Sequence, residues 1–235
     1  SVTKIDARKK ATGEAIYTGD MHLPGTLCGL ILRSTVAHAR LVRVDTTKAE
    51  QLPGVMAVVT AKDAMPVRIG RFIRDRTPLA SGKVRHLGEA IAAVAAVDRL
   101  TAERALSLID VKYQELPAVF DPREALGAEA PVIHEELSSY MDVTPSKRYG
   151  NVRNEVRYAW GDLEGALREA ELVYEQTYVT QASHAAYMEP RVALAAPDAT
   201  GRVTVWSSTK SPFIFRGPVA QTLGLPISKI RVVAP

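Results

Sequence analysis

An imidazole and a carboxylate lie five residues apart in the stretch QASHAAYMEP, which contains His184 and Glu189. Such a pair could perform acid–base chemistry, because a carboxylate can orient a histidine ring whose pKa lies near neutral pH. Five residues is a poor spacing for one face of a helix. A structural hydrogen bond at the end of a strand explains the same residues, and we favour this interpretation, since an isolated pair is weak evidence for catalysis.

A second candidate is the basic stretch VRIGRFIRDRT, in which four arginines surround Phe72. These are Arg68, Arg71, Arg74 and Arg76. Each guanidinium offers paired donors, so the cluster could bind a phosphate or a carboxylate of a substrate or a partner. A solvated loop is the simpler interpretation, and we expect residues 66–82 to form an exposed loop.

The stretch STKSPF, residues 208–213, is a third candidate at the end of a predicted strand. Pro212 suits the first position of a helix, and helix N-termini attract anions. Lys210 would add a positive charge at the same place. Capping of the helix by Ser211 explains these residues without any ligand.

Other motifs of cofactor and metal sites are absent from the sequence. It contains no dinucleotide-binding GxGxxG, no phosphate-binding P-loop, no zinc-binding HExxH and no GxSxG nucleophile elbow. The remaining histidines, His22, His38, His86 and His134, are isolated and lack metal-ligand spacing, so we expect no metal ligands. Cys28 is the only cysteine, which excludes an internal disulfide and a four-thiolate cluster held by this chain alone.

Composition predicts a globular protein with one large domain or two small ones. The chain has 235 residues, of which 46% are hydrophobic. Its 30 basic and 26 acidic residues give a net charge of +4, which is too weak an excess to indicate nucleic acid as a partner. The apolar run at residues 90–97 is far shorter than the ~20 residues of a membrane-spanning helix. The start SVTKIDARKK lacks the apolar segment of a signal peptide, so we expect a cytoplasmic protein.

Alternating strand-like and helix-like segments must position these candidates. The first half predicts strands at residues 26–33, 39–44, 55–60, 90–97 and 110–116, and helices at 46–52 and 98–109, the latter capped by Asp98. The periodicity fades at residues 122–150, where apolar anchors at Val132, Ile133, Leu137, Tyr140 and Met141 indicate a linker that wraps across a surface. This organisation predicts domains at 1–121 and 151–235.

The second half begins with residues 154–160 and continues with a helix at 163–170, which Asp162 can cap. Strands are predicted at 171–182, twice within 191–208 around a Pro-Asp-Ala-Thr-Gly turn, and at the final residues 230–233. Between these last strands we expect a helix that is broken or restarted at Pro218.

Taken in order, residues 6–63, 83–126, 160–198 and 201–235 resemble one family almost phrase by phrase. This family is the molybdenum-binding large subunit of molybdenum hydroxylases of the xanthine dehydrogenase and aldehyde oxidase type. The resemblance implies a mixed α/β chain of the α+β class, with a hammerhead-like domain followed by the first, incomplete part of a molybdopterin-binding domain. It covers essentially the whole chain.

The resemblance also implies where the cofactor would lie. Residues near the molybdenum centre would be Thr209, Lys210, Ser211 and Phe213. At Lys210 the family commonly has glutamine, whose amide would hydrogen-bond an oxygen ligand of the metal; lysine offers a charge on a flexible stem instead. The GGGFGGK-type loop that helps enclose the pterin, and the catalytic glutamate base, would lie beyond SKIRVVAP. We therefore expect no catalytic residue within this chain.

By resemblance, the chain is a component of a molybdopterin-dependent hydroxylase or dehydrogenase that oxidises an aldehyde, an N-heterocycle or an aromatic CoA ester. Its partners would be the remaining part of the large subunit, an iron–sulfur subunit with 2Fe-2S clusters and an FAD subunit. The alternative is a non-catalytic scaffold or a degenerate half-subunit that docks partners. The chain would be a fragment or a separately encoded first part, with apolar surface exposed around Trp206, Phe213, Phe215 and Ile230.

Overall fold

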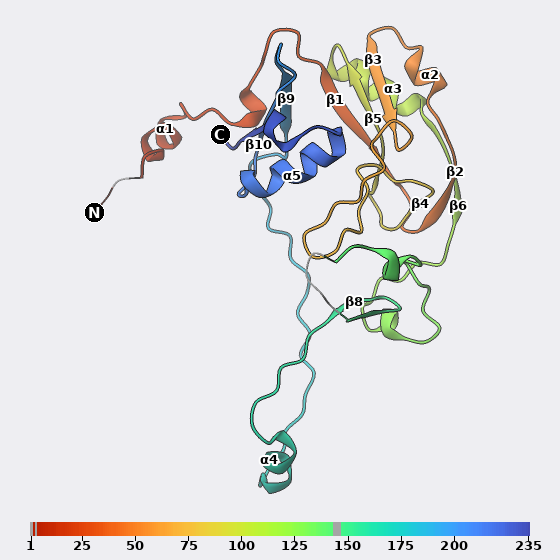
Figure 1. The fold of residues 1–235 in the computed structure, drawn as a ribbon, viewed down its shortest axis with the longest axis vertical. Helices are drawn as coiled ribbons and strands as arrows, with labels where there is room; N and C mark the ends of the chain where they lie inside the picture. Colours follow the sequence, from red (N-terminus) through yellow and green to blue (C-terminus); the bar gives the residue numbers. More distant parts are fainter. Residues whose placement is uncertain (1, 3, 143–146) are drawn as a thin grey trace.

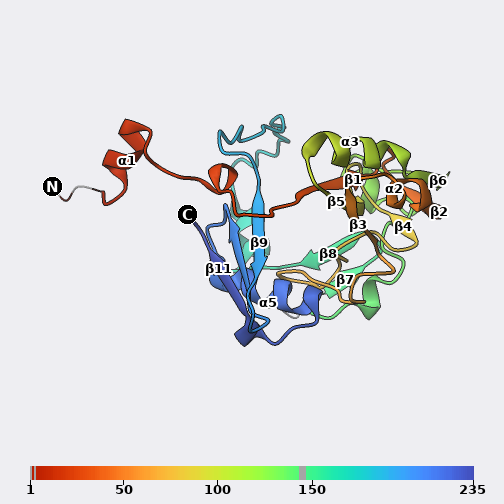
Figure 2. The same cartoon turned by 90° about the horizontal axis from the view of Figure 1, so that it is seen from above.

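The computed structural model describes residues 2, 4–142 and 147–235. Figure 1 shows two groups of sheets side by side, and a long arm that extends away from them and carries α4 (Leu163–Glu169) at its tip. The N-terminal helix α1 (Ala7–Thr12) lies apart from both groups (Figures 1 and 2), and none of its residues is buried. The mixed helix and sheet class expected from the sequence is confirmed.

The first group contains an antiparallel sheet of order β1-β5-β3 with helices packed against it. Its elements are β1 (Cys28–Arg33), α2 (Thr47–Glu50), β3 (Val55–Thr60), β5 (Ala90–Ala96) and α3 (Arg99–Leu108). Ala102 and Ala105 lie on one face of α3 and are fully buried against this sheet, since small side chains allow a close approach. As predicted, Asp98 caps α3: its carboxylate accepts the Thr101 N–H at 2.7 Å.

A second sheet of order β4-β2-β6 completes the first group. It consists of β2 (Ala39–Asp45), β4 (Lys83–Val84) and β6 (Asp110–Glu115). A small core connects it to β5, because Ile91 on β5 is 1% exposed and packs with the fully buried Ala39 and Val84. The strands and helices predicted for residues 26–60 and 90–116 are therefore confirmed, with shifts of a few residues at their ends.

The basic segment at residues 66–82 is less exposed than its composition indicates. Ile73, Leu79 and Ala80 are buried, so the prediction of an exposed loop is wrong for these positions. The physical reason is local pairing: the Ala80 N–H donates to the Ala90 carbonyl at 2.7 Å, and Ile73 forms a β-bridge with Asp142. These contacts hold the apolar residues of the segment against the body.

The predicted linker at 122–150 packs along the first group. Its regular elements are η2 (Glu124–Leu126), η3 (Leu137–Ser139) and β7 (Lys147–Tyr149), which pairs with β8 (Val152–Glu155). Tyr140 is the strongest of the predicted anchors and is buried, whereas Val132 and Met141 are exposed and do not anchor the chain. Residues 143–146 of this segment lie outside the described residues, and the domain boundaries remain a prediction.

Residues 156–192 form the arm that Figure 1 shows leaving the body. Every residue of this arm is exposed except Gly165, which is half-buried. The predicted helix is confirmed as α4, with the Gly165 N–H donating to Asp162 at 2.9 Å. The predicted strand at 171–182 is wrong, because these residues form no ladder. A strand needs a neighbouring strand or surface, and the described chain brings none to residues 171–182, which are all exposed.

The second group is a three-stranded sheet of order β11-β10-β9. Its elements are β9 (Ala193–Pro197), β10 (Val203–Ser207), α5 (Pro212–Leu223), η4 (Ile227–Lys229) and β11 (Ile230–Val233), and η1 (Thr18–Asp20) contacts β9. β9 and β10 form the antiparallel hairpin predicted from the turn between them. β10 and β11 are parallel and are connected through α5, which makes a βαβ unit.

Pro218 does not break α5, contrary to the prediction. Gly217 precedes it, and a residue without a Cβ removes much of the clash that proline imposes on its predecessor. Phe213 and Phe215 are exposed as expected, at 83% and 50%, but Ile230 is 2% exposed because β11 pairs with β10. No helix of the described ranges is long and apolar enough to span a membrane.

Candidate functional site

The carboxyl ends of β10 and β11 meet at one edge of their sheet. Trp206 is paired with Val233 in the parallel register, so the loop after β10 and the chain after β11 leave the sheet side by side. In sheets of this kind, ligands bind beyond the carboxyl ends of the parallel strands, where the loops into the helices lie. Residues 208–211, between β10 and α5, form such a loop.

The loop presents hydrogen-bond donors toward this edge. Pro212 occupies the first turn of α5, as predicted, and the first N–H groups of a helix have no partner within it. Ser211 stands at the cap position, but its hydroxyl accepts no helical N–H, so capping does not explain this residue. Its own N–H donates to the Thr209 hydroxyl at 3.2 Å, which shapes the turn.

Lys210 is exposed in this turn, and within the described parts of the chain its ammonium makes no ion pair. Phe213, at the start of the helix, is exposed as well. Arg216, one turn further along α5, ties the helix to β11 by donating to the carbonyls of Ile230 at 3.0 Å and Ile227 at 2.8 Å. Arg216 therefore fastens α5 to the amino end of β11, opposite to the candidate edge, while the exposed side chains of Lys210 and Phe213 stay free to contact a ligand.

The His184 and Glu189 pair does not form in the structure. The Nδ1 atom of His184 accepts the Ala186 N–H at 2.9 Å, and no hydrogen bond joins it to Glu189. Glu189 instead lines an apolar hollow of about 700 Å³ together with Tyr17 and Met188. The prediction of a hydrogen bond between these two side chains is therefore wrong, because His184 bonds to the Ala186 backbone instead.

The four arginines of the basic segment divide into two pairs. Arg71 and Arg76 are exposed, whereas Arg68 and Arg74 are half-buried. The guanidinium carbon of Arg68 lies 4.5 Å from the centre of the Tyr140 ring, in a cation–π contact. A solvated loop therefore describes only half of the cluster.

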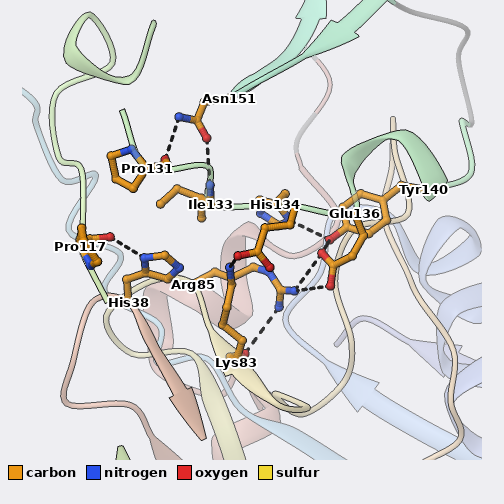
Figure 3. A network of polar contacts seen from close by, with 11 residues as sticks. His38, Lys83, Arg85, Pro117, Pro131, Ile133, His134, Glu136, Tyr140 and Asn151 are labelled. Carbon is orange, nitrogen blue, oxygen red and sulfur yellow. Dashed lines mark hydrogen bonds and ion pairs between the residues drawn. The ribbon is translucent and has the colours of Figure 1, made fainter. Parts of the chain in front are cut away.

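A polar network that the sequence does not reveal joins the segment after β4 to the linker (Figure 3). The Nη2 atom of Arg85 lies 3.3 Å from both oxygens of Glu136. The Tyr140 hydroxyl donates to Glu136 at 3.1 Å and lies 2.9 Å from Nδ1 of His134. Because Tyr140 donates to the carboxylate, His134 must donate to Tyr140 from Nδ1, which fixes the tautomer of this ring.

The environment of His134 lowers its pKa below the ordinary value of 6.5. Burial is the main cause and the positive charge of Arg85 adds to it, while Asp75 and Glu136 act in the opposite direction. A neutral, bonded histidine of this kind supports the structure. The only sign of this network in the sequence is that His134, Glu136 and Tyr140 lie close together. Arg85 lies 51 residues before Glu136 and could not be connected with them.

Further contacts in Figure 3 hold the same segment in place. Nδ1 of His38 lies 2.6 Å from the Pro117 carbonyl, and Asn151 donates to the Pro131 carbonyl at 3.1 Å. Lys83, whose side chain is 8% exposed, lies 3.3 Å from Glu135. Across the described residues, no group of three or more His, Cys, Asp or Glu side chains could hold a metal ion.

Comparison with known proteins identifies both parts of the chain. Residues 12–117 match the a/b hammerhead domain of aldehyde oxidase and xanthine dehydrogenase. Residues 145–235 match the molybdopterin cofactor-binding domain. Together these matches define a protein in which an a/b hammerhead domain precedes a molybdopterin cofactor-binding domain, and the loop at 208–213 falls within the cofactor-binding match.

Individual relatives agree with these matches. The chain is 37% identical over 235 residues to a probable xanthine dehydrogenase subunit of Bacillus subtilis, covering 100% of this chain and 30% of the relative. It is 34% identical to the nicotinate dehydrogenase large molybdopterin subunit of Eubacterium barkeri, covering 98% of this chain and 51% of that protein. A reconstituted CO dehydrogenase from Oligotropha carboxidovorans has a similar structure, with a TM-score of 0.84, 32% identity and coverage of 100% of this chain and 30% of the other.

The chain belongs to the xanthine dehydrogenase and aldehyde oxidase family of molybdenum hydroxylases, and it corresponds to an N-terminal part of the molybdenum-binding subunit. It spans about a third to a half of the length of the curated relatives described above. The family predicted from the sequence is confirmed.

Proposed function

We propose that this chain supplies one wall of a molybdopterin site in a molybdenum hydroxylase or dehydrogenase. The observation that carries the proposal is the common edge of β10 and β11, where the loop at 208–213 lies within the cofactor-binding match. A chain segment that continues from β11 would emerge beside this loop. Two adjacent loops at the carboxyl ends of parallel strands are a common arrangement for enclosing a cofactor.

The donor set of the loop fits a cofactor rich in oxygen atoms. Thr209, Lys210 and Ser211 offer hydroxyl and ammonium groups, and the start of α5 adds backbone N–H groups. None of the three is a strong metal ligand, so their role is to orient the cofactor by hydrogen bonds while Phe213 covers an apolar part of it. The molybdopterin group, when bound, supplies the two-electron oxidation.

Electrons would leave through partner subunits. Cys28 is the only cysteine of the chain, so 2Fe-2S clusters must be held elsewhere, and we assign them to an iron–sulfur subunit, with FAD on a further subunit. The cytoplasmic location expected from the sequence stays a prediction for the assembled enzyme. Among the three predicted substrate classes we place N-heterocycles first, because relatives are named for xanthine and nicotinate.

Contact with the remaining part of the large subunit is supported by the arm. Apolar side chains along residues 156–192 are exposed, among them Trp160 at 81%, Leu172 at 83% and Val179 at 82%. Tyr158 and Trp160 stack on each other with ring centres 5.7 Å apart. Many exposed apolar side chains on one segment favour its burial against another polypeptide.

Lys210 tests the proposed site in the complete enzyme that carries this chain. Lys210→Ala should lower kcat by about tenfold or more, because a lost hydrogen bond to a charged group costs about 1.5–3 kcal/mol. Lys210→Gln should retain more activity, since its amide can still donate. Lys112→Ala, an exposed lysine on β6, is the matched control, and molybdenum content should be the same in all three variants.

The same experiment separates this proposal from the alternative. Unchanged turnover in Lys210→Ala, with normal molybdenum content, would favour a scaffold that docks partners without contacting the cofactor. Loss of molybdenum in Lys210→Ala alone would mean that the loop retains the cofactor rather than tuning its reaction.

A further inference from the structure

A hollow of about 410 Å³ lies where three segments of the chain converge. Arg68 and Arg74 line it from the basic segment, Ser139 and Tyr140 from the linker, and Gln221 from α5. It is separate from the loop at 208–213, which precedes the other end of α5. The hollow is therefore lined by a loop of the first group, by the linker and by the helix of the second group.

Positive charge is concentrated in the segment that contributes both arginines of this hollow. Residues 66–85 contain six basic residues and one acidic residue, Asp75, for a net charge of +5, which exceeds the net charge of +4 of the whole chain. Local excess of one sign in a concave, partly desolvated site strengthens its attraction for an ion of the opposite sign.

The nearby carboxylates are already bound to other cations. Glu136 lies 3.3 Å from Arg85, Asp142 lies 3.0 Å from Arg148, and Asp75 is nearest to Arg76. Throughout the described parts of the chain, no ion pair or hydrogen bond involves the guanidinium of Arg68 or Arg74, the half-buried arginines of this hollow. Glu136 also acts on Arg68 electrostatically, but among the described residues no carboxylate pairs with the guanidinium of Arg74. A half-buried cation of this kind is stabilised when an anionic ligand neutralises it.

The structure holds the guanidinium of Arg68 and the backbone of Arg74 in place for such a ligand. Arg68 lies over the ring of Tyr140, a residue that is 3% exposed and fixed through its hydroxyl to Glu136. The backbone N–H of Arg74 donates to the Met141 carbonyl at 3.0 Å. A preorganised guanidinium such as that of Arg68 loses little side-chain entropy on binding, and each arginine can donate two parallel hydrogen bonds to one oxyanion.

We propose that the hollow between Arg68 and Arg74 binds a small oxyanion of the phosphate or carboxylate class. The Gln221 amide would donate a further hydrogen bond from α5. A bound anion would join the basic segment, the linker and α5 through one ligand. The concave shape favours a small molecule, whereas Arg71 and Arg76 are exposed and do not line the hollow.

Calorimetric titration of the complete enzyme with inorganic phosphate, and separately with acetate, at constant ionic strength tests this proposal and distinguishes the two ligand chemistries. Saturable binding of at least one anion is expected. Arg68→Gln and Arg74→Gln should each weaken it by about tenfold or more, because a hydrogen bond to a charged group contributes about 1.5–3 kcal/mol. Arg71→Gln, from the same segment but outside the hollow, is the matched control and should change the affinity less than about twofold.

Gln221→Leu provides a variant that keeps the fold, since the Gln221 side chain is exposed and makes no hydrogen bond among the described residues. Gln221→Leu should also weaken anion binding, and it serves as the test if the arginine variants do not fold. The proposal is overturned if neither anion binds saturably, or if Arg71→Gln weakens binding as much as Arg68→Gln. It is also overturned if the arginine variants keep full anion affinity and lose only affinity for a partner subunit.

Discussion

Trp206 on β10 lies opposite Val233 on β11 in a parallel register, which brings the ends of both strands to one edge of the sheet. This relationship places the loop at 208–213 next to whatever follows β11. Arg216 holds α5 on the same sheet from the other end, because its guanidinium binds the backbone of η4 and of the first residue of β11. The candidate site thus depends on a strand order that only the folded chain reveals.

His134 should make the stability of the protein depend on pH. Its pKa in the folded chain lies below the ordinary value of 6.5, so the unfolded chain binds the proton more readily. The contribution of neutral His134 to the free energy of unfolding should therefore be complete above pH 6.5. It should be lost as the pH falls through the lower pKa of the folded chain. Urea unfolding at pH 7.5 and pH 5.5 measures this loss.

His134→Gln removes the titrating group and should reduce the difference in stability between the two pH values. His22→Gln, which replaces an exposed histidine, should keep the wild-type difference. An equal pH dependence in wild type and His134→Gln would show that another group is responsible.

Ile91 should contribute strongly to the stability of the first group of sheets. It is 1% exposed and packs between the two sheets, so Ile91→Ala leaves a cavity and should lower the free energy of unfolding by about 2–5 kcal/mol. Ile31→Ala is the matched control, since Ile31 on β1 is 46% exposed. Chemical unfolding of both variants measures the difference, and similar losses would contradict the described core.

Trp160 on the arm should matter for assembly rather than for folding. Trp160→Ser should leave the unfolding midpoint of the isolated chain unchanged, because the side chain is exposed and stacks on Tyr158 of the same arm. It should raise the dissociation constant for the remaining part of the large subunit by about tenfold or more, as buried tryptophans dominate many interfaces. Sedimentation or calorimetry measures this affinity.

Phe120→Ser is the control for the arm, because Phe120 is equally exposed, at 82%, but lies outside residues 156–192. It should weaken association little. If both substitutions reduce affinity equally, the effect reflects general surface hydrophobicity and the arm has no special role.

The local elements could be predicted from the sequence because their signals are local. Asp98 and Asp162 cap the helices that follow them, Pro212 begins α5 and Gly224 ends it in the left-handed conformation. The strand predicted at 171–182 failed because a strand needs a partner, which no local pattern supplies. The network of Arg85, Glu136 and Tyr140 could not be predicted either, since its members meet only through tertiary packing.

The candidate site was predicted by a different kind of evidence. Thr209, Lys210, Ser211 and Phe213 were selected by resemblance to a family, and their spacing alone allowed a simple helix cap. The structure removes that simpler explanation, because the Ser211 hydroxyl caps nothing. Their contact with a cofactor remains a prediction.

Elemental analysis of molybdenum tests the central claim most directly. The isolated chain of residues 1–235 should contain essentially no molybdenum, because it supplies only one wall of the proposed cofactor site. The same chain, coexpressed and purified with a polypeptide that supplies the rest of the large subunit, should contain stoichiometric molybdenum. Stoichiometric molybdenum in the isolated chain, or none in the assembled enzyme, would contradict the account.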